Sequence, residues 1–179
     1  MGLKMTNLVD KKCISTEWYT PPEILEPVRN LFGGNIGLDP CTNMEKNPTK
    51  ADWVIGLPQD GLEAQWIEAR GKTVFVNPPY GKALYDWISK VVLEAFRGLK
   101  IVLLVSASSR WDQAKWQKIY SPELTTFVMP RGRVKFFNAE GVRMKSPPYP
   151  SVLYFYNIDP ADVKKHFGRL GTVVKQEVL

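Results

Sequence analysis

The sequence predicts one compact α/β domain with a mostly parallel sheet that carries an antiparallel edge. Short apolar runs alternate with amphipathic segments along the 179 residues, which is the pattern of strands alternating with helices. The run at 100–105 is apolar after its first residue, as expected for a parallel strand buried on both faces. The last strands are expected to be joined by turns, which indicates the antiparallel edge. With 44% hydrophobic residues, a chain of this length can bury a substantial core.

The first predicted helix covers residues 22–32. Proline is tolerated in the first turn of a helix, and Thr20 is expected to act as the N-cap. Gly33 and Gly34 then end the helix, because glycine readily adopts the backbone conformation found after a helix. A short strand is expected directly afterwards, at 35–38.

A clearer strand is predicted at 72–76, because this run is rich in β-branched and aromatic residues. A helix at 82–96 follows, and Gly98 is expected to end it. The apolar residues of this helix recur at i, i+3 and i+4 spacing, which predicts one buried face. That face consists of Leu84, Trp87, Ile88, Val91, Val92 and Ala95.

The second half of the chain begins with the strand at 100–105, followed by a polar loop through Arg110. A helix is expected at about 112–119, and another helix with a fraying end is expected after Pro160. The remaining strands are predicted at 124–129, 134–137 and 151–156.

These elements suggest a flexible N-terminal tail at 1–15, a main domain at 16–158, and a C-terminal helix and tail at 159–179. No apolar run approaches the ~20 residues of a membrane span, and the first ten residues lack the apolar stretch of a signal peptide. We therefore expect a cytoplasmic protein, and one that is a monomer.

The composition narrows the range of chemistry. The net charge of +6 favours a polyanionic partner such as a nucleic acid. His166 is the only histidine, which argues against hydrolases that use a histidine base. Cys13 and Cys41 lack the clustered spacing of a zinc site, so no metal is expected.

The strongest signal is the tetrapeptide Asn77-Pro78-Pro79-Tyr80, which follows an apolar strand and precedes a helix. The exocyclic amine of adenine is a poor nucleophile, so an enzyme must place acceptors against its N–H bonds. The side chain of Asn77 and the main-chain carbonyl of Pro78 can be these acceptors, and the two prolines stiffen the turn. Tyr80 can stack on a base that has flipped out of the duplex.

The catalytic interpretation of this tetrapeptide has a structural alternative, and the sequence contains a second candidate tetrapeptide. Asn-Pro-Pro can simply be a turn at the end of a strand. A second tetrapeptide, Ser146-Pro147-Pro148-Tyr149, follows a polar segment and precedes a strand, so we assign it to a loop that lines the base pocket.

Four motifs in order carry a resemblance to a known family. They are Trp18-Tyr19-Thr20-Pro21, Leu38-Asp39-Pro40-Cys41, Asp60-Gly61-Leu62 with Trp66, and Asn77-Pro78-Pro79-Tyr80-Gly81. This set resembles the phage-encoded DNA N6-adenine methyltransferase family, over roughly residues 17–156. The resemblance implies a Rossmann-like methyltransferase fold with helices on both faces of the sheet, S-adenosylmethionine as cofactor and double-stranded DNA as substrate.

The resemblance also assigns residues to the cofactor. Thr20 and Pro21 would border its methionine end, Asp39-Pro40-Cys41 would bind it after the first strand, and Asp60 and Leu62, around Gly61, would touch its adenine. Alternatively, Asp39-Pro40 and Asp60-Gly61 are ordinary turn dipeptides without a role in binding. The segment 39–43 contains no glycine, unlike the glycine-rich loop of many methyltransferases. No motif identifies the acidic residue that would hold the ribose, and Asp52 is our candidate.

Two basic groups are candidates for contacts with DNA phosphates. One group begins just after the strand at 124–129 and consists of Arg131, Arg133, Lys135 and Arg143. The other follows the strand at 100–105 and consists of Arg110 and Lys115. Solvated surface charges are the alternative interpretation.

Other functions fit the same tetrapeptide. Amino-methyltransferases also act on cytosine N4, on RNA and on glutamine side chains. Each of these substrates presents a planar, conjugated nitrogen that the same acceptors could bind. A non-catalytic nucleic-acid-binding protein that has lost cofactor affinity is a further alternative, suggested by the loop without glycine. The intact tetrapeptide argues against it.

Overall fold

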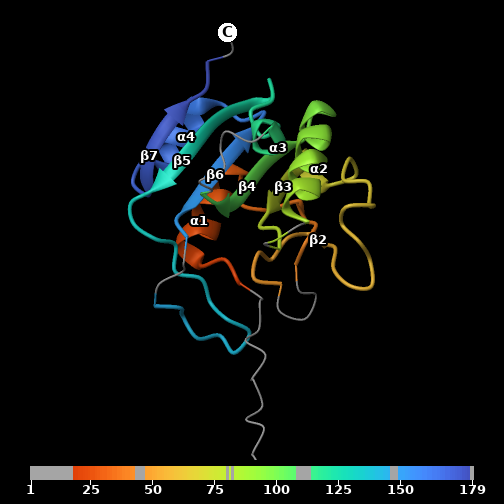
Figure 1. Cartoon of the computed structure of the whole chain (residues 1–179), viewed down its shortest axis with the longest axis horizontal. Coiled ribbons are helices and arrows are strands. Elements are labelled where there is room, and N and C mark those ends of the chain that lie inside the picture. Colours follow the sequence, from red (N-terminus) through yellow and green to blue (C-terminus); the bar gives the residue numbers. More distant parts are fainter. Residues whose placement is uncertain are drawn as a thin grey trace, which may run out of the picture.

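The structure is a computed structural model that describes residues 18–42, 47–79, 81, 83–107, 114–145 and 149–177. Its strands form one seven-stranded sheet with the order β2-β1-β3-β4-β6-β5-β7 (Figure 1). The strands are β1 Leu38–Asp39, β2 Trp53–Val54, β3 Thr73–Val76, β4 Lys100–Ser106, β5 Leu124–Pro130, β6 Ser151–Tyr156 and β7 Gly171–Lys175. The helices are α1 Pro22–Leu31, the 3-10 turn η1 Arg70–Lys72, α2 Leu84–Phe96, α3 Ala114–Gln117 and α4 Pro160–Phe167.

The sheet is mixed, so the predicted α/β class is confirmed. β2, β1, β3 and β4 are parallel neighbours, whereas β6 runs antiparallel between β4 and β5, and β7 runs antiparallel to β5. In the described part of the chain the antiparallel region is as extensive as the parallel one. It contains three late strands, as many as predicted, but β7 takes the place of the strand predicted at 134–137.

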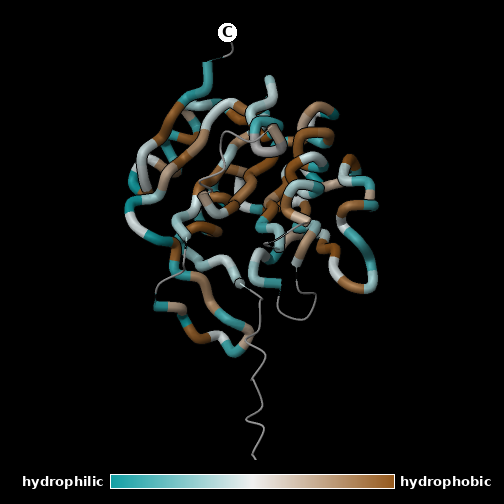
Figure 2. Tube along the Cα trace, viewed as in Figure 1, coloured by the Kyte–Doolittle hydropathy of each residue, from teal (hydrophilic) through white to brown (hydrophobic). Residues whose placement is uncertain are grey.

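Side chains of the central strands alternate between two hydrophobic clusters. Val74 and Val76 of β3 belong to a cluster that includes the buried side chains of α2, whereas Phe75 belongs to a cluster that includes α1 and α4. This alternation follows from the two-residue period of a strand. Figure 2 shows the result, since the tube is largely brown along the central strands and α2. Burial of each large apolar side chain stabilises the folded state by roughly 1.5–3 kcal/mol. The central sheet is therefore stable enough to hold the loops at its ends in place.

The helix boundaries follow the sequence signals with one exception. α1 ends before Gly33 and Gly34, whose φ angles are +79° and +114°. The Gly34 N–H donates to the Arg29 carbonyl at 2.8 Å, which closes the last turn. The N-cap residue is Pro21, and no side chain caps the helix, so the prediction that Thr20 is the N-cap is wrong.

The predicted buried face of α2 is largely confirmed. Leu84, Trp87, Ile88, Val91 and Ala95 are buried, whereas Val92 is only half-buried. Glu94 is also completely buried, which the apolar pattern does not predict. Gly98 follows the helix with a φ angle of +93° and donates to the Ala95 carbonyl.

Several other predicted elements need correction. Residues 134–137 do not form a strand, and only Phe137 makes isolated bridges, to Tyr19 and Arg143. The first strand is two residues long and begins at Leu38, and β2 was not predicted at all. The C-terminal residues do not fray after α4, because Gly171–Lys175 pairs with β5. α3 is shorter than expected, and residues 112–113 lie outside the described residues.

Within the described residues, no helix is long and apolar enough to cross a membrane.

Candidate active site at the carboxyl edge of the sheet

The order of the strands creates a switch point between β1 and β3. From β1 the chain goes to β2 on one side, and then returns to form β3 on the other side of β1. In open α/β sheets, ligands bind in the crevice outside the carboxyl ends of strands at such a point. Asp39 is the last residue of β1, and Asn77 follows the last residue of β3. The topology therefore places both predicted site residues at this crevice.

The side chain of Asn77 is held in one orientation. Its Nδ2 atom donates to the main-chain oxygen of Trp18 and to the Oγ1 atom of Thr20, both at 3.1 Å. A carbonyl oxygen only accepts hydrogen bonds, so the amide nitrogen must face Trp18. The Oδ1 atom is then buried and has no partner within the described structure. Leaving a buried acceptor unpaired costs about 1–3 kcal/mol, which a ligand N–H would recover.

The rest of the tetrapeptide surrounds this acceptor. Pro78 is buried and Pro79 is exposed. Neither has an N–H to compete for nearby acceptors. Tyr80 lies outside the described residues, as do Ser146, Pro147 and Pro148 of the second tetrapeptide, whose Tyr149 is exposed.

Asp39 is a buried carboxyl group that several hydrogen bonds hold in place. It accepts hydrogen bonds from the Cys41 N–H at 3.2 Å and from the Thr49 hydroxyl at 2.8 Å. Burial raises the pKa of Asp39 to about 6, although the hydrogen bonds from Thr49 and Cys41 act in the opposite direction. At neutral pH the group is ionised but close to protonation.

Cys41 connects Asp39 to the tetrapeptide. Its thiol is not in a disulfide, and it lies beside the Asp39 carboxyl group and the main chain of Asn77. Burial raises the pKa of the Cys41 thiol, and the negative charge of Asp39 raises it further, although a hydrogen bond from the Asn77 main-chain N–H lowers it. A raised pKa favours the protonated thiol, which is the less nucleophilic form, so we expect Cys41 to have a packing role.

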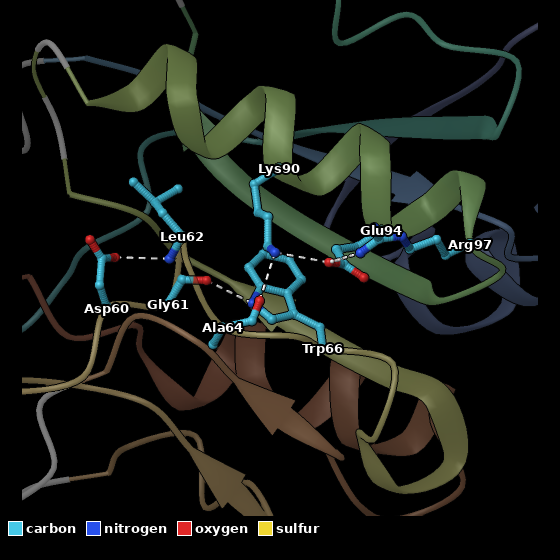
Figure 3. A network of polar contacts seen from close by, with 8 residues as sticks. All are labelled: Asp60, Gly61, Leu62, Ala64, Trp66, Lys90, Glu94 and Arg97. Atoms are coloured by element: carbon cyan, nitrogen blue, oxygen red, sulfur yellow. Dashed lines mark hydrogen bonds and ion pairs between the residues drawn. The ribbon is translucent and has the colours of Figure 1, made fainter.

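Residues 60–62 lie against the loop after β1. A Cβ atom on Gly61 would lie 1.9 Å from the carbonyl oxygen of Pro40 and 2.8 Å from the ring of Trp87, so only glycine fits there. The Asp60 side chain accepts from the Leu62 N–H at 2.9 Å (Figure 3). The structure thus brings together two of the motifs that the sequence assigns to the cofactor.

A buried ionic network fixes this segment to α2 (Figure 3). Lys90 donates to the Ala64 carbonyl at 2.7 Å, lies 5.4 Å from the centre of the Trp66 ring and pairs with Glu94 at 2.9 Å. Arg97 pairs with the same oxygen of Glu94 at 3.0 Å. Sequence reasoning missed this network, although the i, i+4 and i, i+3 spacing of the three residues was a signal for it.

A hairpin at 136–144 packs beside the N-terminal segment of the site. Tyr19 and Phe137 exchange two main-chain hydrogen bonds of 2.9 and 3.0 Å. The hairpin closes through Met144 N–H to the Phe136 carbonyl at 2.8 Å and Asn138 N–H to the Val142 carbonyl at 3.0 Å. A cavity of about 320 Å³ lies among the N-terminal segment, the hairpin, α1 and residues 48–50. It is lined by Tyr19, Thr20, Pro22, Leu25, Glu26, Arg29, Pro48, Lys50, Phe137, Asn138 and Gly141.

Four of the six basic residues predicted to contact DNA have described side chains. Arg131, Arg133, Lys135 and Arg143 are exposed and follow the end of β5. β5 runs in the same direction as β4, because both are antiparallel to β6, so its end lies at the same edge as Asn77. Arg143 contacts the Glu23 carboxylate and lies 5.7 Å from the centre of the Phe137 ring. Arg110 and the side chain of Lys115 lie outside the described residues.

Asp52 is not the acidic residue expected after the second strand. It precedes β2, and its carboxylate accepts from Asn35 at 2.7 Å and lies 3.6 Å from Arg70. This position is at the amino end of the parallel strands, away from Asp39 and Asn77. The described residues contain no group of three or more side chains that could hold a metal ion.

Comparison with known families agrees with this arrangement. The family model described as DNA N-6-adenine-methyltransferase (Dam) matches residues 9–177 of the chain. No curated protein matches the chain, and no solved structure does.

Proposed function

The chain belongs to the DNA N-6-adenine-methyltransferase (Dam) family, and from this premise we propose which residues carry out methyl transfer to DNA adenine. The match covers nearly the whole chain, including β7. The protein is therefore an enzyme that acts on DNA. We propose that its mixed sheet is a Rossmann-like methyltransferase fold with helices on both faces. The two hydrophobic clusters support this, since one contains α2 and the other contains α1 and α4.

The methyl donor S-adenosylmethionine would bind in the crevice at the switch point. The donor supplies an electrophilic methyl group on a positively charged sulfur. The residues present fit such a group, because Asp39 is a buried carboxylate and its hydrogen-bond donors among the described residues, the Cys41 N–H and the Thr49 hydroxyl, carry no charge. Pro40 and Cys41 would form one wall of the site, and Asp60, Gly61 and Leu62 would form another. Pro21 would lie at the methionine end, and for Thr20, which the family resemblance also places there, the hydrogen bond from Asn77 suggests a second role.

The unpaired Oδ1 atom of Asn77 is the observation that carries the proposal. It is a buried acceptor at the carboxyl edge of a parallel strand, and its orientation is fixed by Trp18 and Thr20. It would accept a hydrogen bond from the adenine amine, with the Pro78 carbonyl as the second acceptor. Holding both N–H bonds stabilises the positive charge that develops on the nitrogen during transfer. Tyr80 would stack on the flipped base.

DNA would approach the edge at which the hairpin at 136–144 and the basic residues that precede it lie. Arg131, Arg133 and Lys135 are exposed there, and their charges suit phosphate contacts. Arg143 would mainly fasten the hairpin to α1, because it already pairs with Glu23. Arg110 and Lys115 stay predicted contacts, and the monomeric state and cytoplasmic location also stay predictions.

The test is a methylation assay with labelled S-adenosylmethionine and duplex DNA, followed by identification of the modified nucleoside. We expect N6-methyladenine from the wild type and a loss of at least about 100-fold in turnover for Asn77→Ala, comparable to removal of one donor from an oxyanion hole. Asn35→Ala is the matched control, since this amide lies at the opposite edge of the sheet. Label in cytosine N4, in RNA or in protein would correct the substrate. Full turnover by Asn77→Ala would refute the proposed role of Asn77.

A further inference from the structure

The segment Trp18–Thr20 lies between the catalytic amide and the hairpin. On one side, the Trp18 carbonyl and the Thr20 hydroxyl accept hydrogen bonds from Asn77. On the other side, Tyr19 is bound to Phe137 through two main-chain hydrogen bonds. The main-chain hydrogen bonds to Phe137 therefore fix the segment independently of its contacts with Asn77.

The two acceptors have different effects on the amide. The Trp18 carbonyl determines which end of the amide faces it, because an Asn77 oxygen in that position would repel the carbonyl oxygen. A hydroxyl can accept or donate, so Thr20 does not select the end. It supplies a second anchor, which stops the amide from rotating about its terminal torsion, a torsion that is otherwise broad.

The burial of Thr20 supports this role. Its residue is only 5% exposed, and its hydroxyl does not cap α1. A buried hydroxyl without a partner would be costly. In the described structure, the hydrogen bond from Asn77 satisfies it.

We propose that Thr20 is a positioning residue that holds the Oδ1 atom of Asn77 toward the adenine amine. The inference rests on the proposed role of Asn77, and it differs from the role at the methionine end of the cofactor that the sequence assigns to Thr20. A positioning residue affects the transfer step, whereas a cofactor contact affects the binding of the methyl donor.

The test compares Thr20→Val and Thr20→Ser in steady-state methylation of duplex DNA. Thr20→Val keeps the shape of the side chain and removes the acceptor. We expect its kcat to fall about fivefold, the equivalent of one hydrogen bond of about 1 kcal/mol. The KM for S-adenosylmethionine should change less than about twofold, as for loss of an interaction made only in the transition state. Thr20→Ser should recover most of the lost turnover because it restores the hydroxyl.

Thr125→Val is the matched control. Thr125 lies in β5, where its hydroxyl donates to the carbonyls of Phe155 and Ile158. This variant should lower the melting temperature without lowering kcat, which separates a general loss of stability from a specific effect on the site. If Thr20→Val does not fold, Thr20→Ala removes the same hydroxyl without adding a methyl group beside it.

Two results would overturn the inference while leaving the role of Asn77 intact. One is a Thr20→Val variant with normal kcat and a raised KM for S-adenosylmethionine, which would make Thr20 a cofactor contact. The other is a Thr20→Ser variant as slow as Thr20→Val, which would show that the hydroxyl has no part in turnover. Measuring Asn77→Ala in the same series keeps the two proposals apart, because normal turnover by that variant would refute the proposed function itself.

Discussion

Replacing Asp39 by asparagine should make the protein more stable at alkaline pH and leave its stability unchanged in acid. Burial raises the pKa of Asp39 from 3.8 to about 6 on folding. The folded state therefore binds the proton more tightly than the unfolded state. The resulting stability is present below about pH 4 and is lost as the pH rises through about 6. A pKa difference of about 2 corresponds to about 3 kcal/mol at about 1.4 kcal/mol per pH unit.

The assay is urea unfolding of wild type and Asp39→Asn between pH 4 and pH 8. Asparagine keeps the size of the side chain and an acceptor for the Cys41 N–H. The difference in unfolding free energy between the two proteins should grow by about 2.5 kcal/mol from pH 4 to pH 8. Asp86→Asn is the control, because it removes an exposed carboxyl group from the first turn of α2. Curves for wild type and Asp39→Asn that stay parallel across this range would refute the reasoning.

The same carboxyl group should have the opposite effect on cofactor binding. If the ionised form of Asp39 attracts the positive charge of S-adenosylmethionine, affinity should fall as the pH drops below about 6. Asp39→Asn should bind the cofactor more weakly and lose this pH dependence. Isothermal titration at pH 5, 6, 7 and 8 would measure both effects. The wild type therefore retains a carboxylate that lowers stability at neutral pH, which is expected of a functional residue.

Three further predictions concern the surroundings of the site. Gly61→Ala should destabilise the protein by about 1–3 kcal/mol and weaken cofactor binding, because its new methyl group would overlap the Pro40 carbonyl; a normal melting temperature would contradict this. Glu94→Gln should lower the free energy of unfolding in urea by about 3–5 kcal/mol, since it leaves the largely buried Lys90 without its counterion. A decrease under about 1 kcal/mol would mean that water solvates the network. Lys135→Ala should weaken DNA binding and reduce the slope of log affinity against log salt by about 1, and an unchanged slope would exclude a phosphate contact.

The parts of the site that follow from local sequence were predictable. Asn77 was placed correctly because an apolar strand, a proline turn and a helix follow one another within a few residues, and each has its own signal. β1 was misplaced because a two-residue strand is too short to show periodicity. Thr20 was predicted to cap a helix because local rules treat a threonine near a helix start as a cap. Its actual partner, Asn77, lies 57 residues away.

The absence of glycine from the segment 39–43 does not mean that the site has been lost. The glycines of such a loop allow close approach of main chains, and here Gly61 allows that approach from the other side, against Pro40. α1 holds the residues that bind Asp39, because Arg29 donates to the carbonyls of Pro48 and Thr49, and the hydroxyl of Thr49 donates to Asp39. The segment just before α1 also holds Asn77 through Thr20. One N-terminal element therefore orients both halves of the site, which explains how two short strands can position it without a glycine-rich loop.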